Sequence, residues 1–195
     1  PEAGRVTIYG KEISELTTED RRKIGVVWAD AGFSGYLMGK DLVPMLKSMY
    51  PAFDEGWFRK KCEEFHLPMD KKLKDFSTGM KAKLKVLSAI ANEDARLLIL
   101  DEPTAGMDVM VREQILDLLR EFMMPGDRSI LISSHISSDL EGFCDDVYLL
   151  NQGKIILHED VDTLLEQYGI LKVTPEQYDT LDKEYLLRVK KEGYG

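Results

Sequence analysis

The stretch LLILDEPTAGMD, residues 97–108, decides the fold. Four apolar residues run straight into two carboxylates, Asp101 and Glu102, and a Gly-containing turn follows Pro103. A short apolar run bounded by turn residues predicts a buried strand. Because a parallel strand brings its carboxyl end to the ligand-binding edge of the sheet, we expect both acids at that edge.

The two carboxylates can take different tasks, since neighbouring residues on an extended chain point apart. One can face Mg²⁺, directly or through water, and the other can face the water that attacks a γ-phosphate. A strand that merely ends in two solvated acids gives the same pattern. A second apolar strand, SILIS, is followed by SSH, which places His135 at the same edge. A neutral imidazole there can hydrogen-bond a γ-phosphate or the attacking water.

The wider pattern predicts an α/β fold. Apolar strands at 23–30, 97–100 and 129–133 alternate with amphipathic helices at 77–92 and 109–122. Such alternation predicts a mostly parallel sheet covered on both faces. Residues 40–75 show only helical patterns, at 39–50 with a break near Pro44 and at 54–65, and we expect an inserted helical lobe.

The C-terminal third predicts smaller elements. A hairpin is expected across NQG, residues 151–153, and a helix from Asp160 to Gly169. Residues 171–195 have strand-helix-strand character, as at the start of an accessory unit.

Composition narrows the function classes. The net charge is −9 and no stripe of Lys or Arg is present, which argues against a nucleic-acid binder. The two cysteines, Cys62 and Cys144, lack paired-ligand spacing and are expected to be reduced thiols without metal or disulfide. No apolar run reaches the length of a membrane span.

The segment FSTGMK opens the helix at 77–92. Ser77 can cap this helix, and Gly79 leaves backbone N–H groups open to an anion. Taken alone, these residues favour an ordinary helix cap over an anion site. The helix end contributes only about 1 kcal/mol toward an anion, so it can position a phosphate but cannot hold a nucleotide alone.

In this order the motifs resemble those of the ATP-binding subunit of ABC transporters, closest to the drug- and antibiotic-export type of bacteria. FSTGM resembles the signature motif L-S-G-G-Q, LLILDEP resembles Walker B, AGMD the D-loop and SSH the switch histidine. KIGVVWADAGF resembles the strand and loop that carry the family's Q-loop. The resemblance runs over residues 1–169 and implies a P-loop NTPase-like fold, with ATP and Mg²⁺ as ligands.

The resemblance implies a role for each matching residue. Asp101 would hold Mg²⁺, Glu102 would be the general base that polarises water, and His135 would sense the γ-phosphate. Ser77 and Gly79 would contact ATP bound to a second, identical subunit.

It also implies partners and a place in the cell. Asp108 would cross the dimer interface and couple the two nucleotide sites. A transmembrane permease would be the other partner, with no nucleic acid. The protein would lie at the cytoplasmic face of a bacterial membrane as a peripheral subunit.

Three positions depart from the family pattern. The first Gly and the Gln of the signature are Thr78 and Met80. The Q-loop glutamine position falls on Ala29, which cannot ligate a metal, and Asp30 next to it offers a carboxylate for Mg²⁺ instead.

The Walker A pattern, Gly, four residues, then Gly-Lys and Ser or Thr, does not occur in the sequence. We therefore expect a fragment whose fold lacks the N-terminal strand and the P-loop. The full-length protein is expected to hydrolyse ATP, whereas these 195 residues are not. The expected divisions are 1–39, part of the ATPase core; 40–92, the helical lobe with the signature; 93–169, the core with Walker B, D-loop and switch histidine; and 170–195, an accessory segment.

Three readings remain open. The first is a transport motor, an ATPase that powers a permease, in the export direction. The second is a non-transport ATPase of the same superfamily. The third is a regulatory or binding module with a degenerate site and no turnover. Ala29 and Thr78 favour it, and Asp101, Glu102, Asp108 and His135 oppose it.

Overall fold

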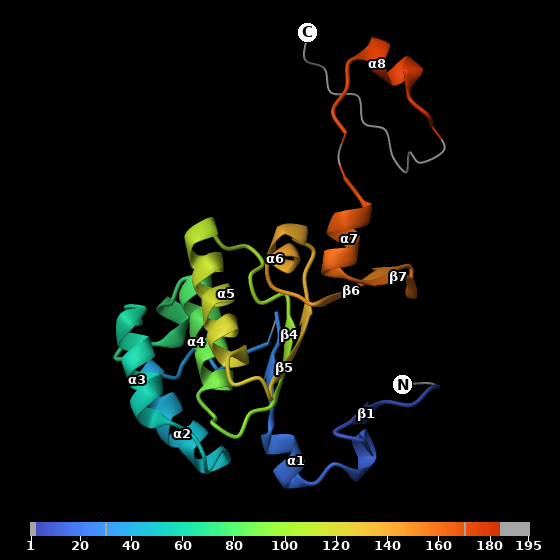
Figure 1. Ribbon diagram of the computed structural model, residues 1–195. Coiled ribbons are helices and arrows are strands. Elements are labelled where there is room, and N and C mark those ends of the chain that lie inside the picture. The colour runs from blue at the N-terminus through green and yellow to red at the C-terminus, as the bar shows by residue number, and fades with distance from the viewer. Residues whose placement is uncertain (1–2, 30, 170, 184–195) are drawn as a thin grey trace. The chain divides into compact units, whose positions relative to one another are not determined.

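The computed structural model describes residues 3–29, 31–169 and 171–183 (Figure 1). Two compact units make up the chain, residues 1–143 and residues 144–195. The finer division into four segments at 39/40, 92/93 and 169/170 stays a prediction.

A parallel sheet of three strands, in the order β3-β4-β5, lies at the centre of the first unit. Its strands are β3 (Ile24–Val27), β4 (Leu97–Asp101) and β5 (Ser129–Ser133). Val27 pairs with Leu100 and Leu100 with Ile132, so these three residues share one face. The predicted strands, their parallel direction and the α/β class are confirmed.

One face of the sheet carries the core. Leu98 and Leu100 are fully buried there, in one cluster with Leu84 and Leu87 of α4 (Thr78–Ile90) and Ile115 of α5 (Val109–Met123). Figure 1 shows both helices beside the strands. The apolar stripes that the sequence predicts for these helices are the surfaces that they bury, as amphipathic helices do.

The opposite face of the sheet is exposed in the described part of the chain, although the pattern predicted helices on both faces. Val26, Ile99 and Leu131 form one row across the three strands. Val26 is 44% exposed and Leu131 is 62% exposed. The reason is topological. The connection through α4 leads from β3 to β4 and the connection through α5 leads from β4 to β5, so both move across the sheet in the same direction. Right-handed crossovers in one direction place both helices on the same face.

The helical lobe expected at 40–75 is present. It holds η2 (Gly39–Asp41), α2 (Leu42–Met49), α3 (Glu55–Glu64) and η3 (Leu73–Asp75). Its core is Leu42, Leu46, Phe58 and Cys62, all buried. The lobe joins the end of α4 through backbone hydrogen bonds, among them Asp54 N–H to the Ala91 carbonyl at 2.8 Å.

The expected break near Pro44 is wrong. Pro44 is the third residue of α2, which continues to Met49. The N–H groups of the first turn have no partner inside a helix, so proline costs no hydrogen bond there.

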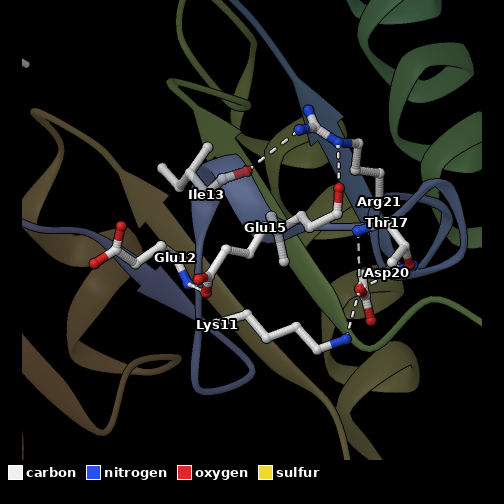
Figure 2. A network of polar contacts seen from close by, with 8 residues as sticks. Lys11, Glu12, Ile13, Glu15, Thr17, Asp20 and Arg21 are labelled. Carbon is white, nitrogen blue, oxygen red and sulfur yellow. Dashed lines mark hydrogen bonds and ion pairs between the residues drawn. The ribbon is translucent and has the colours of Figure 1, made fainter.

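The segment before β3 is held by polar contacts, which Figure 2 shows. It contains β1 (Thr7–Ile8), β2 (Lys11–Glu12), η1 (Ile13–Glu15) and α1 (Thr18–Arg22). Lys11 Nζ lies 2.8 Å from Asp20 Oδ2, and Thr17 N–H donates to the same carboxylate. The hydrogen bond from Lys11, and then those from Thr17, hold the pKa of Asp20 well below its ordinary value. This contact therefore favours folding above the ordinary carboxyl pKa, and acid weakens it.

The second unit starts with an antiparallel hairpin, β6 (Asp146–Asn151) and β7 (Lys154–Asp160). Its turn places Gln152 and Gly153 at positive φ, 48° and 74°, as a two-residue hairpin turn of type I′ requires. The hairpin and the helix after Asp160 were predicted, and α7 (Val161–Gln167) is capped by Asp160.

The helix of the predicted strand-helix-strand end is present as α8 (Pro175–Thr180), whereas the strand predicted before it is wrong. Residues 171–174 and 181–183 form no strand. Residues 184–195 lie outside the described residues.

Both cysteines are free thiols, as expected. Burial raises the pKa of the Cys62 thiol to about 12, which keeps it protonated and unreactive. Among the described residues, no helix combines the length and the apolar character that crossing a membrane requires.

The packing of β3 against Leu98 of β4 and Ala89 of α4 depends on Gly25. A methyl group at Gly25 would lie 2.5 Å from Leu98 Cδ2 and 3.2 Å from the Ala89 carbonyl oxygen. We expect Gly25→Ala to lower the free energy of unfolding by about 1–3 kcal/mol, because Leu98 is fully buried and cannot move aside. Urea unfolding measures the change.

Gly56→Ala is the matched control for this prediction. A methyl group at Gly56, inside α3, meets its nearest atom, Asp54 Oδ1, at 3.4 Å. Stability should stay the same or rise by about 0.5–1 kcal/mol, since alanine is the better helix former. Equal effects of the two substitutions would contradict the tight packing of β3 on α4.

Candidate functional site

The carboxyl ends of β4 and β5 are fastened together. Asp101 and Ser133 are the last residues of the two strands and lie opposite each other. The Ser133 hydroxyl donates to Asp101 Oδ1 at 2.8 Å. The Glu102 N–H lies 3.1 Å from the Ser133 carbonyl oxygen and 3.2 Å from its hydroxyl. These bonds fix how the chain leaves both strands.

We call the hydrogen bonds among Asp101, Glu102 and Ser133 the strand-end clasp. Next to it, the Glu102 side chain contacts His135. Glu102 Oε2 lies 2.7 Å from His135 Nδ1. A carboxylate accepts hydrogen bonds only, so Nδ1 carries the proton and Nε2 is left as the other ring nitrogen. The Glu102 side chain is 26% exposed and the His135 side chain 70%, so both can reach a ligand at this edge. Both residues lie at the same edge of the sheet, as expected, and the structure adds the direct contact between them.

The backbone at Glu102 is strained. Its φ is 47°, in the left-handed region that non-glycine residues rarely adopt. Such a conformation costs about 1–2 kcal/mol and persists only where the surroundings enforce it. The hydrogen bonds to Ser133 do so here. The strain turns the Glu102 side chain away from the direction that a continued strand would give it.

Asp101 is the predicted Mg²⁺ ligand, and it is the last residue of β4. Mg²⁺ commonly binds one or two carboxylates, with phosphate oxygens and water as the other ligands. A single carboxylate on a rigid strand end is suited to that role. Among residues 3–29, 31–169 and 171–183, no group of three or more His, Cys, Asp or Glu side chains forms a metal cage. Asp30, the other predicted metal ligand, lies outside the described residues.

A second cluster of predicted site residues lies where α4 and α5 begin. Ser77 caps α4, with its hydroxyl 3.2 Å from the Met80 N–H, and Asp108 caps α5, with Oδ1 3.0 Å from the Val111 N–H. A methyl group at Gly79 would lie 3.1 Å from a Val111 methyl. Gly79 therefore permits the close approach of the two helix starts.

Charge also links the two helices. Burial lowers the pKa of Lys83 on α4, and the nearby Asp108 carboxylate opposes this shift. The sequence predicted Ser77, Gly79 and Asp108 as separate motifs, and the structure brings them to one place. Their roles toward a nucleotide stay predictions.

Lys85 was missed by the sequence analysis. Its Nζ on α4 donates to the carbonyl oxygens of Trp28 at 2.7 Å and Ala29 at 3.1 Å. A third carbonyl oxygen, that of Ala31, lies 3.3 Å from the same nitrogen. The ammonium group thus ties the helix that starts with the signature motif to the segment after β3. The helix contains several lysines, and nothing in the sequence distinguishes Lys85 as the one that makes this contact.

Comparison with known proteins gives a consistent family. A profile of the family described as "ABC transporter" matches residues 1–105. The ABC transporter ATP-binding protein YtrB of Bacillus subtilis is 35% identical over 66% of this chain and 44% of its own length. The lantibiotic transport ATP-binding protein SrtF of Streptococcus pyogenes is 32% identical over 82% of this chain and 68% of its own.

A third relative, the bacitracin transport ATP-binding protein BcrA of Enterococcus faecalis, is 28% identical over 84% of this chain. The chain spans 44% of the length of YtrB and 54% of the length of BcrA.

Solved structures share the fold. The ATP-binding subunit of an ABC transporter superposes with a TM-score of 0.72 at 23% identity, over 91% of this chain and 75% of that one. A dimeric ATP-binding cassette, MJ0796 bound to ADP and phosphate, gives a TM-score of 0.69 at 23% identity, over 83% and 75%.

The Lys85 contacts predict a local role in stability. Lys85→Met should lower the free energy of unfolding by about 1–3 kcal/mol, because hydrogen bonds from a charged donor are lost and carbonyl groups are left without it. Urea unfolding measures this change. Lys81→Met, at an exposed position of the same helix, is the control and should have an effect below about 0.5 kcal/mol. Equal effects at the two positions would show that the Lys85 contacts do not hold the segment after β3.

Proposed function

The chain belongs to the ATP-binding proteins of the ABC transporter family, and from this premise we propose that it forms part of an ATPase that powers a membrane permease, in the export direction. The contact between Glu102 and His135, 2.7 Å at the carboxyl edge of the sheet, is the observation that carries the proposal. The names of SrtF and BcrA, which refer to lantibiotic and bacitracin transport, support an export role.

In this proposal the residues at the ends of β4 and β5 have different roles in ATP hydrolysis. Asp101 would hold Mg²⁺, which would neutralise charge on the phosphates. The Glu102 carboxylate accepts a proton from the attacking water as general base. His135 donates from Nδ1 to Glu102, which orients the imidazole and leaves Nε2 as an acceptor for a proton of the attacking water.

We propose a second copy of the subunit as the other partner. Ser77 and Gly79 would contact ATP on that copy, and Asp108 would cross the interface. Val109 and Met110, next to Asp108, are 63% and 77% exposed and offer apolar surface for such a contact. The dimeric form of the MJ0796 cassette supports this arrangement by similarity. The assembly would lie at the cytoplasmic face of a bacterial membrane, on its permease.

A regulatory module without turnover is the second candidate. Thr78 and Met80 replace a Gly and the Gln of the signature, and Ala29 stands at the Q-loop glutamine position. Met80 and Ala29 replace amide side chains by apolar ones, and Thr78 adds a side chain where the family has none, whereas the Glu102–His135 contact keeps the proposed hydrolytic pair. A non-transport ATPase of the same family differs from the main proposal in its partner, not in this site.

Glu102→Gln in the full-length protein tests the proposed chemistry. The amide cannot accept the proton, so we expect ATP hydrolysis to fall about 100- to 1000-fold while ATP binding persists. Phosphate release and size-exclusion chromatography with ATP measure turnover and the accumulation of ATP-bound dimers.

Glu113→Gln, on the exposed surface of α5, is the matched control and should leave turnover unchanged. Full activity of the Glu102→Gln variant would assign the base to another residue. No turnover in the unaltered protein would favour the regulatory module.

We also infer that these 195 residues alone bind ATP weakly. In P-loop NTPases, backbone N–H groups and the lysine of Gly-x4-Gly-Lys-Ser/Thr grip the β- and γ-phosphates, and this sequence lacks that motif. Titration of Mg²⁺-ATP against the chain should give a dissociation constant of about 1 mM or weaker. Binding in the micromolar range would contradict the inference.

A further inference from the structure

Asp139 is a buried carboxylate that the proposed chemistry does not use. It lies in α6 (Ser137–Glu141), four residues after His135, and is 2% exposed. A buried charge is costly unless partners compensate it, so its contacts are informative.

Two segments supply its partners. The Thr104 hydroxyl, fully buried, donates to Asp139 Oδ2 at 2.7 Å. Arg112 Nε forms an ion pair of 3.3 Å with Asp139 Oδ1. The Arg112 side chain is 20% exposed, and its Nε atom is buried and forms no hydrogen bond of good geometry. We call Thr104, Arg112 and Asp139 the Asp139 cluster.

Each member of the Asp139 cluster lies close in the sequence to a predicted site residue. Thr104 follows Glu102 by two residues, and Asp139 follows His135 by four. Arg112 lies in the first turn of α5, where its N–H donates to the Asp108 carbonyl at 3.0 Å. One buried carboxylate thus joins the segments that carry Glu102, His135 and Asp108.

The geometry points to a positioning role: we propose that Asp139 holds the turns after β4 and β5 in the register in which Glu102 meets His135, and couples them to the start of α5. This inference rests on the proposed function. The strand-end clasp at Ser133 fastens the two turns on one side, and the Thr104–Asp139 bond fastens them again farther along. Hydrogen bonds at two separate points restrict rotation of the two turns relative to each other, whereas a single point of contact would allow such rotation. The Arg112 arm extends the restraint to Asp108.

Thr104→Val tests the link between the turns with little change of shape. The valine keeps the volume of threonine and removes the donor, while Thr104→Ser keeps it. In the full-length protein we expect Thr104→Val to lower kcat for ATP about tenfold, because small misplacements of catalytic groups are costly. KM should change by less than about twofold, since no phosphate contact is removed. Thr104→Ser should retain kcat within about twofold.

Amide hydrogen exchange at Glu102 gives a readout independent of turnover. This N–H donates to Ser133 across the two turns. Thr104→Val and Asp139→Asn should speed its exchange about tenfold, while Leu98 and Leu100 in β4 keep their rates, because the opening is local. Asp117→Asn, an exposed acid on α5 with 69% side-chain exposure, is the control and should change neither rate.

Each outcome decides a different claim. Unchanged exchange at Glu102 in Thr104→Val would overturn the proposal, whatever the turnover. Faster exchange with unaltered kcat would show that the cluster stabilises the turns without serving the reaction, and would also overturn it. Exchange that rises equally at Glu102 and in β4 would indicate loss of global stability and count against it. If the unaltered full-length protein does not hydrolyse ATP, the proposed function fails, and the exchange data still decide whether Asp139 fastens the turns.

Discussion

The parallel pairing of β4 with β5 is the constraint on which the candidate site depends. It places Asp101 opposite Ser133, and hydrogen bonds at that rung direct the chain out of both strands. Glu102 then adopts a left-handed backbone conformation and meets His135. A shift of this pairing by one residue would turn Ser133 to the other face of the sheet and remove the clasp. The buried side chains Leu98 and Leu100 oppose such a shift, so the core that forms the fold also sets the chemistry at its edge.

The helices α4 and α5 extend the site away from the strand ends. Both pack on one face of the sheet, and their first residues meet at Gly79 and Val111. The helix starts that Ser77 and Asp108 cap thereby approach each other, although 31 positions separate the two caps in the sequence. The two cap side chains each accept a hydrogen bond from an N–H group of the first helical turn, and Asp108 remains exposed at the surface. Structural and proposed functional roles coincide at these residues.

Two features hold loops that carry no regular structure. Lys85 binds the carbonyl groups after β3, and the Asp139 cluster binds the turns after β4 and β5. In each case a charged group compensates polar groups that have no partner in a helix or sheet. All three strand ends are therefore tied to neighbouring elements. Such restraint would favour the proposed catalysis, because preorganised groups need not reorient when a ligand binds.

The sequence by itself determined most helices and strands and the motifs that indicate the protein family. Apolar runs and helical periodicity gave the strands, the two long helices, the lobe and the hairpin, because burial imposes these patterns on the chain. The motifs around Asp101, Glu102 and His135 identified the family, which the comparisons confirm. Local patterns misjudged Pro44, since they do not show at which turn of a helix a proline lies.

Only the tertiary structure decided which faces are covered and which side chains meet. The exposed row Val26, Ile99 and Leu131 follows from two crossovers in one direction, which no periodicity records. The contacts of Lys85 and Asp139 join residues distant in the sequence, and single polar residues carry no pattern that announces a partner. Burial of a helix or strand face requires apolar residues at regular spacing, so the sequence shows it. A hydrogen bond between distant segments requires no such spacing and forms only once the chain has folded.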